Sequence, residues 1–256
     1  MVNGVSADWM IELGLSDERR KATFRIPEGV SIYAIGDVHG RSDLLDRLFS
    51  RIDDDLVANP VRRPIHVFLG DYIDRGPDSC GVLDRLIQRA ETHEAVFLKG
   101  NHELFLHQFL REPATLAQWR QYGGLDTLMS YGVASKFNAD ADELSAIAER
   151  LGRALPMRHR HFLSRLLNSY SCGDFFFAHA GVRPNVALDQ QREQDLLWIR
   201  DEFLNYQYDF GKIVVHGHTP VDEPDIRPNR INIDTGAYAT GKLTCLILEQ
   251  DKRWFI

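Results

Sequence analysis

Five short segments of the sequence combine glycine or alanine with residues whose side chains commonly bind metal ions. They read GDVHG at 36–40, GDYIDRG at 70–76, GNHE at 100–103, HAG at 179–181 and HGHT at 216–219. Carboxylate and amide oxygens together with imidazole nitrogens form a mixed ligand set, which suits manganese, iron or zinc better than magnesium or calcium. These residue types therefore predict a site for divalent metal ions.

Each segment follows, within two residues, a short apolar run that predicts a buried strand. The runs are 31–35, 66–69, 95–98, 175–177 and 213–215. Leucines at helical spacing lie between the first three runs, and strands that alternate with helices predict βαβ units in a largely parallel sheet. Because sites in such sheets form outside the carboxyl ends of the strands, the five segments should converge although they lie far apart in the chain.

The remaining sequence predicts one domain over 1–256 with three distinct parts. Residues 1–29 are polar and weakly patterned, which predicts a solvated N-terminal arm or a short helix. Residues 103–168 contain helical stripes and no convincing strand, which predicts a helical insertion over the sheet edge. Further apolar runs at 231–233 and 243–248 leave little room for crossover helices, so the second half should add a mixed or antiparallel sheet.

Composition excludes several classes of protein. The 256 residues are 44% hydrophobic and 26% charged, which is ordinary for a globular protein able to bury a core without disulfides. With 30 basic and 37 acidic residues the net charge is −7, which argues against nucleic acid or an anionic membrane as the main partner. The three cysteines are too scattered for a disulfide framework, and no leader or membrane-length apolar run is seen. We expect a cytoplasmic protein.

The five segments resemble, in order and spacing, the signature of calcineurin-like metallophosphoesterases. More narrowly they resemble the PPP-type serine/threonine phosphoprotein phosphatases of bacterial type, which are related to diadenosine tetraphosphatases; the resemblance covers roughly 31–245. It implies an α/β fold, a four-layer αββα sandwich with a helical insertion beside the active-site face. It also implies a dinuclear centre of two divalent ions, with manganese expected first and iron or zinc possible.

The resemblance assigns a role to each matching metal ligand. It implies that Asp37 and His39 hold one ion, that Asp71 bridges both, and that Asn101, His179 and His218 hold the other. One carboxylate offers two oxygens, which suits Asp71 to a bridge. His216 is a second candidate in the last segment, and the family pattern, which places the ligand directly after glycine, favours His218.

His102 follows the ligand Asn101 and is expected at the edge of the metal site. Asp74, three residues beyond Asp71, can reach it, and a carboxylate beside an imidazole raises the pKa of the imidazole and holds its orientation. We therefore predict that His102 is the general acid and that Asp74 orients it. Glu103 is expected to support the turn at Asn101 rather than take part in the chemistry.

Arginines are expected to bind the substrate phosphate, because a guanidinium matches phosphate oxygens in pairs. The resemblance implies this role for Arg75. A second arginine is expected between the HAG and HGHT segments, and Arg200 fits best, with Arg183 and Arg192 as competitors. Tyr238 is either a residue at the mouth of the site or an ordinary tyrosine at the sheet edge.

The first functional interpretation is a metal-dependent phosphatase acting on phosphomonoesters, specifically phosphoserine or phosphothreonine in proteins. A metal-bridging hydroxide would attack phosphorus directly, without a phosphoenzyme. The alternative is a hydrolase of dinucleoside polyphosphates such as diadenosine tetraphosphate, because small relatives with the same metal site have this activity. A non-catalytic metal-binding module would be expected to lack His102 or Arg75, and both are present. The basic segment 153–165 is either a solvated face or a surface that recognises an acidic substrate.

Overall fold

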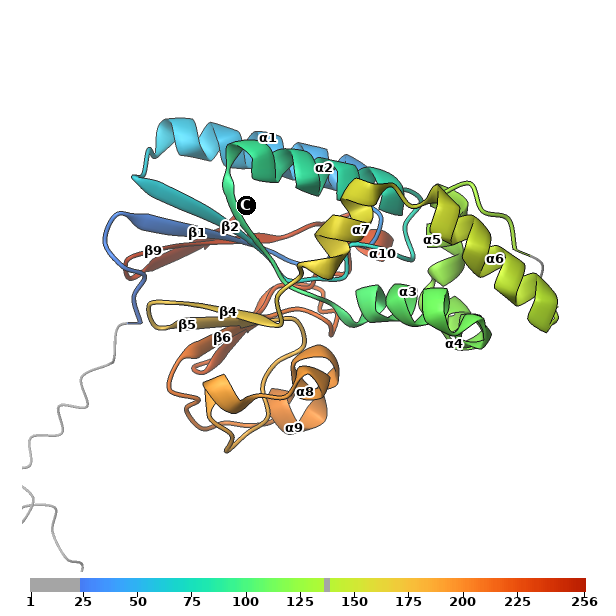
Figure 1. Cartoon of the computed structure of the whole chain (residues 1–256). Helices are drawn as coiled ribbons and strands as arrows, with labels where there is room; N and C mark the ends of the chain where they lie inside the picture. Colours follow the sequence, from blue (N-terminus) through green and yellow to red (C-terminus); the bar gives the residue numbers. More distant parts are fainter. Residues whose placement is uncertain (1–23, 136–138) are drawn as a thin grey trace, which may run out of the picture.

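The computed structural model describes residues 24–135 and 139–256 (Figure 1). The predicted arm at 1–29 therefore lies mostly outside the described residues. Its last part packs onto the fold, because Ile26 is buried and its N–H donates to the carbonyl of Gln250 over 2.9 Å. This part differs from the solvated arm that its polar composition predicts.

The first half of the chain builds the parallel part of one sheet. β1 (Val30–Ile35) pairs in parallel with β2 (Arg63–Phe68), and β2 pairs in parallel with β3 (Glu94–Phe97). The connections are α1 (Ser42–Ala58) and α2 (Ser79–Thr92), whose buried leucines recur at helical spacing and face the sheet. The predicted βαβ units are confirmed.

The end of the chain completes the same sheet. β9 (Cys245–Glu249) and β10 (Lys252–Phe255) add to it in antiparallel pairings, and β9 lies directly beside β1 in the order β10-β9-β1-β2-β3. The sequence shows the strand at 243–248 but does not show which sheet it joins.

A second sheet has the order β4-β5-β6-β8-β7. Its strands are β4 (Ser169–Cys172), β5 (Phe175–Ala178), β6 (Ile213–His216), β7 (Asp225–Ile226) and β8 (Arg230–Asn232). β5, β6 and β8 run parallel, whereas β4 and β7 pair antiparallel at the edges, so the predicted mixed sheet is confirmed. Its outer face is covered by α8 (Glu193–Trp198) and α9 (Asp201–Leu204) (Figure 1).

Alternation of side chains along the strands explains why the sheets stack. In β1, Ile32 and Ala34 are buried between the two sheets, whereas Tyr33 and Ile35 belong to the core under α1 and α2. In β5, Phe177 points between the sheets in the same way. Both faces of each sheet are therefore apolar, and the result is the four-layer αββα arrangement that the family resemblance implies (Figure 1).

The region at 103–168 is helical in its described residues, as predicted, and its apolar side chains extend the core under α1 and α2. Its helices are α3 (Asn101–Arg111), α4 (Leu116–Trp119), α5 (Gly124–Ser130), α6 (Ala141–Ala154) and α7 (Met157–Ser164), with 3₁₀ turns at Pro113–Thr115 and Arg120–Tyr122. α3 to α6 project to one side of the sheets, and α7 returns against α2 (Figure 1). A 3₁₀ turn at Leu188–Gln190 and α10 (Ala237–Thr240) complete the elements. Within the described ranges, every helix is too short or too polar to cross a membrane.

Candidate metal centre

The predicted ligands converge because each follows the carboxyl end of a strand. Asp37 and His39 follow β1, Asp71 follows β2, Asn101 opens α3 after β3, and His179 and His218 follow β5 and β6. All six side chains are at least nine-tenths buried. The two sheets therefore present their ligand-bearing ends to one common space.

The backbone around this space is unusual. Five of the non-glycine residues with positive φ angles lie in these turns: His39 (45°), Asp71 (53°), Asp74 (72°), Arg75 (65°) and His218 (66°). This left-handed region is sparsely populated by residues with a Cβ atom, and such conformations concentrate at functional sites. The turns therefore direct these side chains at a cost in backbone free energy.

Glycine is required at two positions where the backbone closely approaches a carboxylate. A Cβ atom on Gly100 would overlap the carboxylate of Asp71, and one on Gly217 would overlap the carboxylate of Asp37. The absence of a side chain at both positions lets the backbone of one segment touch the carboxylate of another.

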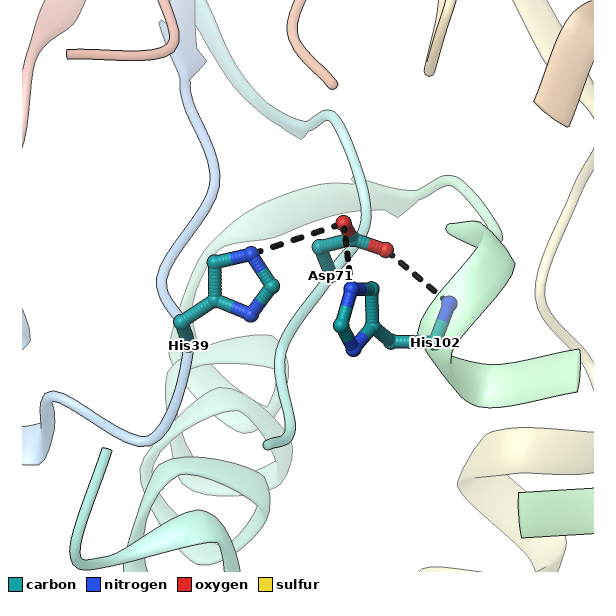
Figure 2. Close-up of side chains that lie close together, drawn as sticks. All are labelled: His39, Asp71 and His102. Carbon is teal, nitrogen blue, oxygen red and sulfur yellow. Dashed lines mark hydrogen bonds and ion pairs between the residues drawn. The ribbon is translucent and has the colours of Figure 1, made fainter. Parts of the chain in front are cut away.

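Two groups of potential ligand atoms share Asp71. In the first, Nε2 of His39 lies 3.5 Å and Nε2 of His102 lies 3.7 Å from Asp71 Oδ2 (Figure 2). In the second, Nε2 of His179 lies 3.4 Å from Asp71 Oδ1, and His218 completes the group. The two oxygens of one carboxylate thus face different groups of potential ligand atoms, which is the arrangement that a bridging role requires.

Asn101 belongs to the second group. Its Oδ1 lies 3.0 Å from Nε2 of His179 and 2.9 Å from Nδ1 of His218. Asp37 also contacts this second group, because its Oδ2 accepts the backbone N–H of His218 over 3.0 Å. The structure therefore brings all six predicted ligands together.

Unpartnered buried atoms test whether this space fits metal ions. Among the described residues, Oδ1 of Asp37 and Nε2 of His218 are buried without a hydrogen-bond partner. Leaving such atoms unpaired is unfavourable, by about 1–3 kcal/mol each and more for a charged group. A divalent cation would satisfy both, and the oxygen and nitrogen donors suit one, so these residues fit a metal centre.

Backbone carbonyls orient two of the imidazoles. Nδ1 of His39 lies 2.9 Å from the carbonyl oxygen of Ile73, and Nδ1 of His179 lies 3.0 Å from that of Leu69. An imidazole that donates one N–H to a carbonyl presents the lone pair of its other nitrogen. Both Nε2 atoms accordingly face the centre.

Burial and neighbouring charges shift the pKa values of the two carboxyl groups in the centre. Burial, together with the carboxylates of Asp234 and Asp71, raises the pKa of Asp37 well above its ordinary value. Burial also raises the pKa of Asp71, but His102, His179 and other imidazoles outweigh it and hold that pKa below its ordinary range. A bound cation would stabilise both carboxylates in their charged forms.

Asp234 is a buried site residue that motif reasoning missed. Burial raises its pKa, and Asp71, Arg75 and Arg200 are among the charged groups close enough to affect it. It lies just beyond β8, so its position after a strand was the available signal. Its Oδ1 accepts the N–H of Gly236 over 2.9 Å.

His102 and Asp74 form a buried pair. Nδ1 of His102 lies 2.7 Å from Asp74 Oδ2, which also accepts Nε1–H of Trp119 over 2.7 Å. Oγ1 of Thr127 donates to the other carboxylate oxygen over 2.5 Å. Burial lowers the pKa of His102, but the carboxylates of Asp71 and Asp74 outweigh it and raise that pKa above its ordinary value. The supporting Trp119 and Thr127 come from the helical region and carry no motif that would have identified them.

Glu103 supports the neighbouring turns, as expected. Its carboxylate accepts backbone N–H groups from Asp71 (3.0 Å), Tyr72 (2.8 Å) and Gly100 (2.8 Å). These bonds hold the segments after β2 and β3 against each other.

Arg75 lies beside the centre and is partly exposed. Its Nη1 is 3.2 Å from Nε2 of His39, and its guanidinium lies 4.7 Å from the ring centre of Tyr238. The Tyr238 ring is also 5.4 Å from the His39 ring. Tyr238 is 37% exposed, so it borders the centre while facing solvent.

Of the candidates for the second phosphate-binding arginine, the geometry favours Arg200 over Arg183. Arg200 is exposed, and its charge is close enough to lower the pKa of His218. Arg183 is instead paired with Asp195 (2.6 Å) and Glu202 (2.9 Å).

His216 is directed away from the centre. Its Nε2 faces the guanidinium of Arg230 at 3.5 Å, and burial lowers its pKa to about 3. Of the two histidines in the HGHT segment, only His218 joins a group of ligand atoms among the described residues.

Aromatic rings line the side of the centre next to the helical region. The ring of Tyr122 lies 5.9 Å from that of His102, and the ring of Trp198 lies 6.2 Å from that of His218. Tyr122 and Trp198 are 6.4 Å apart, and both contact Phe105. Sequence reasoning did not identify Tyr122, because a lone tyrosine in a helical segment carries no motif.

Comparisons with known proteins agree with this geometry. Residues 30–246 match the family model described as calcineurin-like phosphoesterase. The asymmetrical bis(5′-nucleosyl)-tetraphosphatase PrpE of Anoxybacillus flavithermus is 28% identical over 83% of this chain and 88% of its own length. The enzyme of the same name from Halalkalibacterium halodurans is 26% identical over 83% and 87%.

Two solved structures share the fold. A protein described as a candidate diadenosine tetraphosphatase aligns with a TM-score of 0.61 and 21% identity over 88% of this chain and 92% of its own. A cold-active protein-tyrosine phosphatase of a psychrophilic Shewanella species aligns with a TM-score of 0.53 and 16% identity over 90% and 83%. At these identities the structures are informative about the fold alone.

Proposed function

The chain belongs to the calcineurin-like phosphoesterase family, and from this premise we propose that it hydrolyses bis(5′-nucleosyl) tetraphosphates. Membership makes it a metallophosphoesterase, a hydrolase of phosphoester bonds. The observation that carries the finer proposal is the similarity to tetraphosphatases over more than four-fifths of both chains. Action on phosphoserine or phosphothreonine proteins, the first expectation from the motifs, has no comparable support.

The family uses two divalent ions, and we assign them to the residues that converge in the centre. They are Asp37, His39, Asp71, Asn101, His179 and His218. When bound, the ions supply Lewis-acid stabilisation of phosphate oxygens and lower the pKa of water. Manganese is the metal that we propose.

The substrate phosphates need cationic groups that are free to turn toward them. Arg75 contacts His39, Arg200 is close enough to lower the pKa of His218, and guanidinium groups bind phosphate oxygens in pairs. The net charge of −7 does not prevent this, because charges farther away than roughly 8 Å are screened at physiological salt. These two arginines would hold the polyphosphate chain over the ligands.

His102 is placed to move a proton. Its Nδ1 is held by Asp74, so the proton that it can give away is the one on Nε2, the atom that faces Asp71. Donation from Nε2 to the departing oxygen would neutralise the charge that develops there. Asp74 is the positioning residue, since it holds the imidazole and stabilises its charged form.

The aromatic rings beside the centre suit a substrate that carries bases. Tyr122, Trp198 and Tyr238 each lie next to a histidine of the site. Base stacking on an aromatic side chain contributes about 1–3 kcal/mol per base. A phosphoserine peptide brings no base to stack on these rings.

The test compares diadenosine tetraphosphate with a phosphoserine peptide on the manganese-loaded protein. We expect kcat/KM to be higher for the tetraphosphate, and we expect its hydrolysis to yield ATP and AMP. Trp198→Leu should raise KM for the tetraphosphate several-fold and leave the peptide unaffected, while Trp254→Leu, at the far strand β10, serves as the control. A preference for the peptide would overturn the proposal and restore the protein phosphatase interpretation.

A further inference from the structure

A second cluster of potential ligands lies outside the phosphoesterase centre. Cys80 and Asp84 are four residues apart on α2, so they share one helix face, and α7 brings His159 against them. One ligand atom from each side chain lies within 4.8 Å of the other two. Thiolate, carboxylate and imidazole together form a donor set typical of zinc.

The imidazole of His159 is held as a metal-binding imidazole usually is. Its ring is completely buried, Nε2 lies 2.6 Å from Asp84 Oδ1, and Nδ1 lies 2.8 Å from the hydroxyl oxygen of Tyr131. If Nδ1–H donates to Tyr131, Nε2 presents a lone pair to the Asp84 carboxylate, and a cation bound by both atoms would turn this contact from repulsive to favourable. Tyr131 thereby occupies the place of the outer partner that fixes the orientation of a ligand histidine.

In the described part of the chain, the contacts of Asp84 involve one of its two carboxylate oxygens. The guanidinium of Arg158 donates to Oδ1 over 2.7 and 2.9 Å, and His159 contacts the same oxygen. Among the described residues, the contacts given for this carboxylate all end on Oδ1, and the Asp84 side chain is 40% exposed. These contacts also show that part of the basic segment 153–165 is engaged within the fold.

We propose that Cys80, Asp84 and His159 form a zinc site separate from the phosphoesterase centre, with water as the fourth ligand. Binding releases the thiol proton of Cys80 to solvent, while His159 binds through Nε2 and keeps its proton on Nδ1. Three protein ligands and one open position are a common zinc arrangement.

The proposed site lies next to the residues that support Asp74. The N–H of Cys80 donates to Oγ of Ser130 over 2.8 Å, and the adjacent Ser79 contacts the backbone N–H of Asp74 over 3.1 Å. Thr127, which donates to Asp74, lies one helical turn before Tyr131. A zinc ion here would join α2 to α7 immediately behind the residues that hold Asp74.

Cobalt is the probe, because a thiolate bound to Co²⁺ gives a charge-transfer band in the near ultraviolet. The ligands assigned to the phosphoesterase centre contain no sulfur, so the band reports on a cysteine site alone. Titrating the manganese-loaded full-length protein with Co²⁺ should produce the band with one equivalent, and Zn²⁺ should remove it. Cys80→Ser should lose the band, whereas Cys172→Ser, which replaces another partly exposed cysteine, should retain it.

A second variant tests the geometry without touching the thiol. Tyr131→Phe removes the partner of His159 Nδ1, and loss of an outer partner weakens metal binding by about 10- to 100-fold. We expect Tyr131→Phe to keep the band but to need correspondingly more Co²⁺. Absence of the band in the wild-type protein, or its persistence in Cys80→Ser, would overturn the proposal and leave Asp84, Arg158 and His159 as an ion-pair cluster only. The readout is independent of activity, so it stands apart from the test of the tetraphosphatase proposal.

Discussion

Replacing His102 with asparagine should separate proton donation from metal binding. The His102 side chain is 1% exposed, and its Nδ1 is held by Asp74 at 2.7 Å. Asparagine is smaller and polar, and its side chain cannot act as an acid near neutral pH. Because His102 is not among the six assigned ligands, the variant should retain both metal equivalents.

The size of the loss should depend on the leaving group. A phosphoserine peptide releases a strongly basic alkoxide, and general acid catalysis contributes about 10²–10⁴-fold to such a step. A tetraphosphate releases a phosphate oxygen whose ordinary pKa is about 6, so it needs little protonation. We expect His102→Asn to lose at least 100-fold on the peptide and under about 10-fold on diadenosine tetraphosphate.

Asp74→Asn should show the same selectivity in weaker form. It removes the charge from a buried hydrogen bond of 2.7 Å, and charge-assisted bonds contribute roughly 1.5–3 kcal/mol. At 1.36 kcal/mol per tenfold in rate, this corresponds to a loss of roughly 10- to 100-fold on the peptide.

The assay is a series of aryl phosphates whose phenols span a wide range of pKa. Plots of log kcat against leaving-group pKa should be steeper for His102→Asn than for the wild type. Metal content and thermal melting check that the variant is folded and loaded, and His107→Asn, also on α3, is the matched control. Parallel plots for wild type and His102→Asn would refute the assignment of His102 as the proton donor.

Three further predictions concern the ligands, the arginines and the pH dependence of stability. Asp71→Asn removes a charge from the residue shared by both groups of potential ligand atoms. Elemental analysis should therefore find that at least one metal equivalent is lost. Retention of both equivalents with normal turnover would contradict the bridging role. Arg75→Ala and Arg200→Ala should each lower kcat/KM by about 10- to 100-fold with unchanged metal content. Arg183→Ala should lower kcat/KM far less, because Arg183 is paired with two carboxylates in the fold. Equal losses in all three variants would reject the assignment of Arg75 and Arg200 to phosphate binding. His66 is buried, and burial with a neighbouring arginine lowers its pKa to about 3. Because the unfolded chain takes up this proton near pH 6.5, the free energy of unfolding should fall as the pH drops from 6.5 toward 3, by roughly 2 kcal/mol at pH 5. His66→Phe should lose that part of the pH dependence in chemical denaturation, and an unchanged profile would exclude His66 as its source.

The convergence of the six candidate ligands could be predicted from the sequence because their placement follows a local rule. Asp37, Asp71 and Asn101 each come within a few residues of the end of a buried strand, and parallel strands carry such residues to one edge. The apolar runs were long enough to identify the strands, and the alternating connections were long enough to be helices. The fold class and the convergence of the segments followed from these two features and from the family resemblance.

The surroundings of the ligands depend on contacts that no local pattern encodes. Trp119 and Thr127 reach Asp74 across 45 and 53 residues, and only the packing of the helical region against α2 places them there. Local periodicity specifies which face of a helix is apolar, but not which helix that face meets. For the same reason the sequence did not predict the cluster of Cys80 with His159, because these two residues lie on different helices.

The return of β9 to the first sheet shows the same limit in the fold itself. The sequence predicted a strand at 243–248, because these apolar side chains must be buried, and the structure has β9 at Cys245–Glu249. It did not determine the partner, since both sheets offered an apolar strand as a neighbour. Tertiary structure decided for β1, where Leu246 and Leu248 of β9 complete the apolar layer between the two sheets and Cys245 and Ile247 complete the core under the helices.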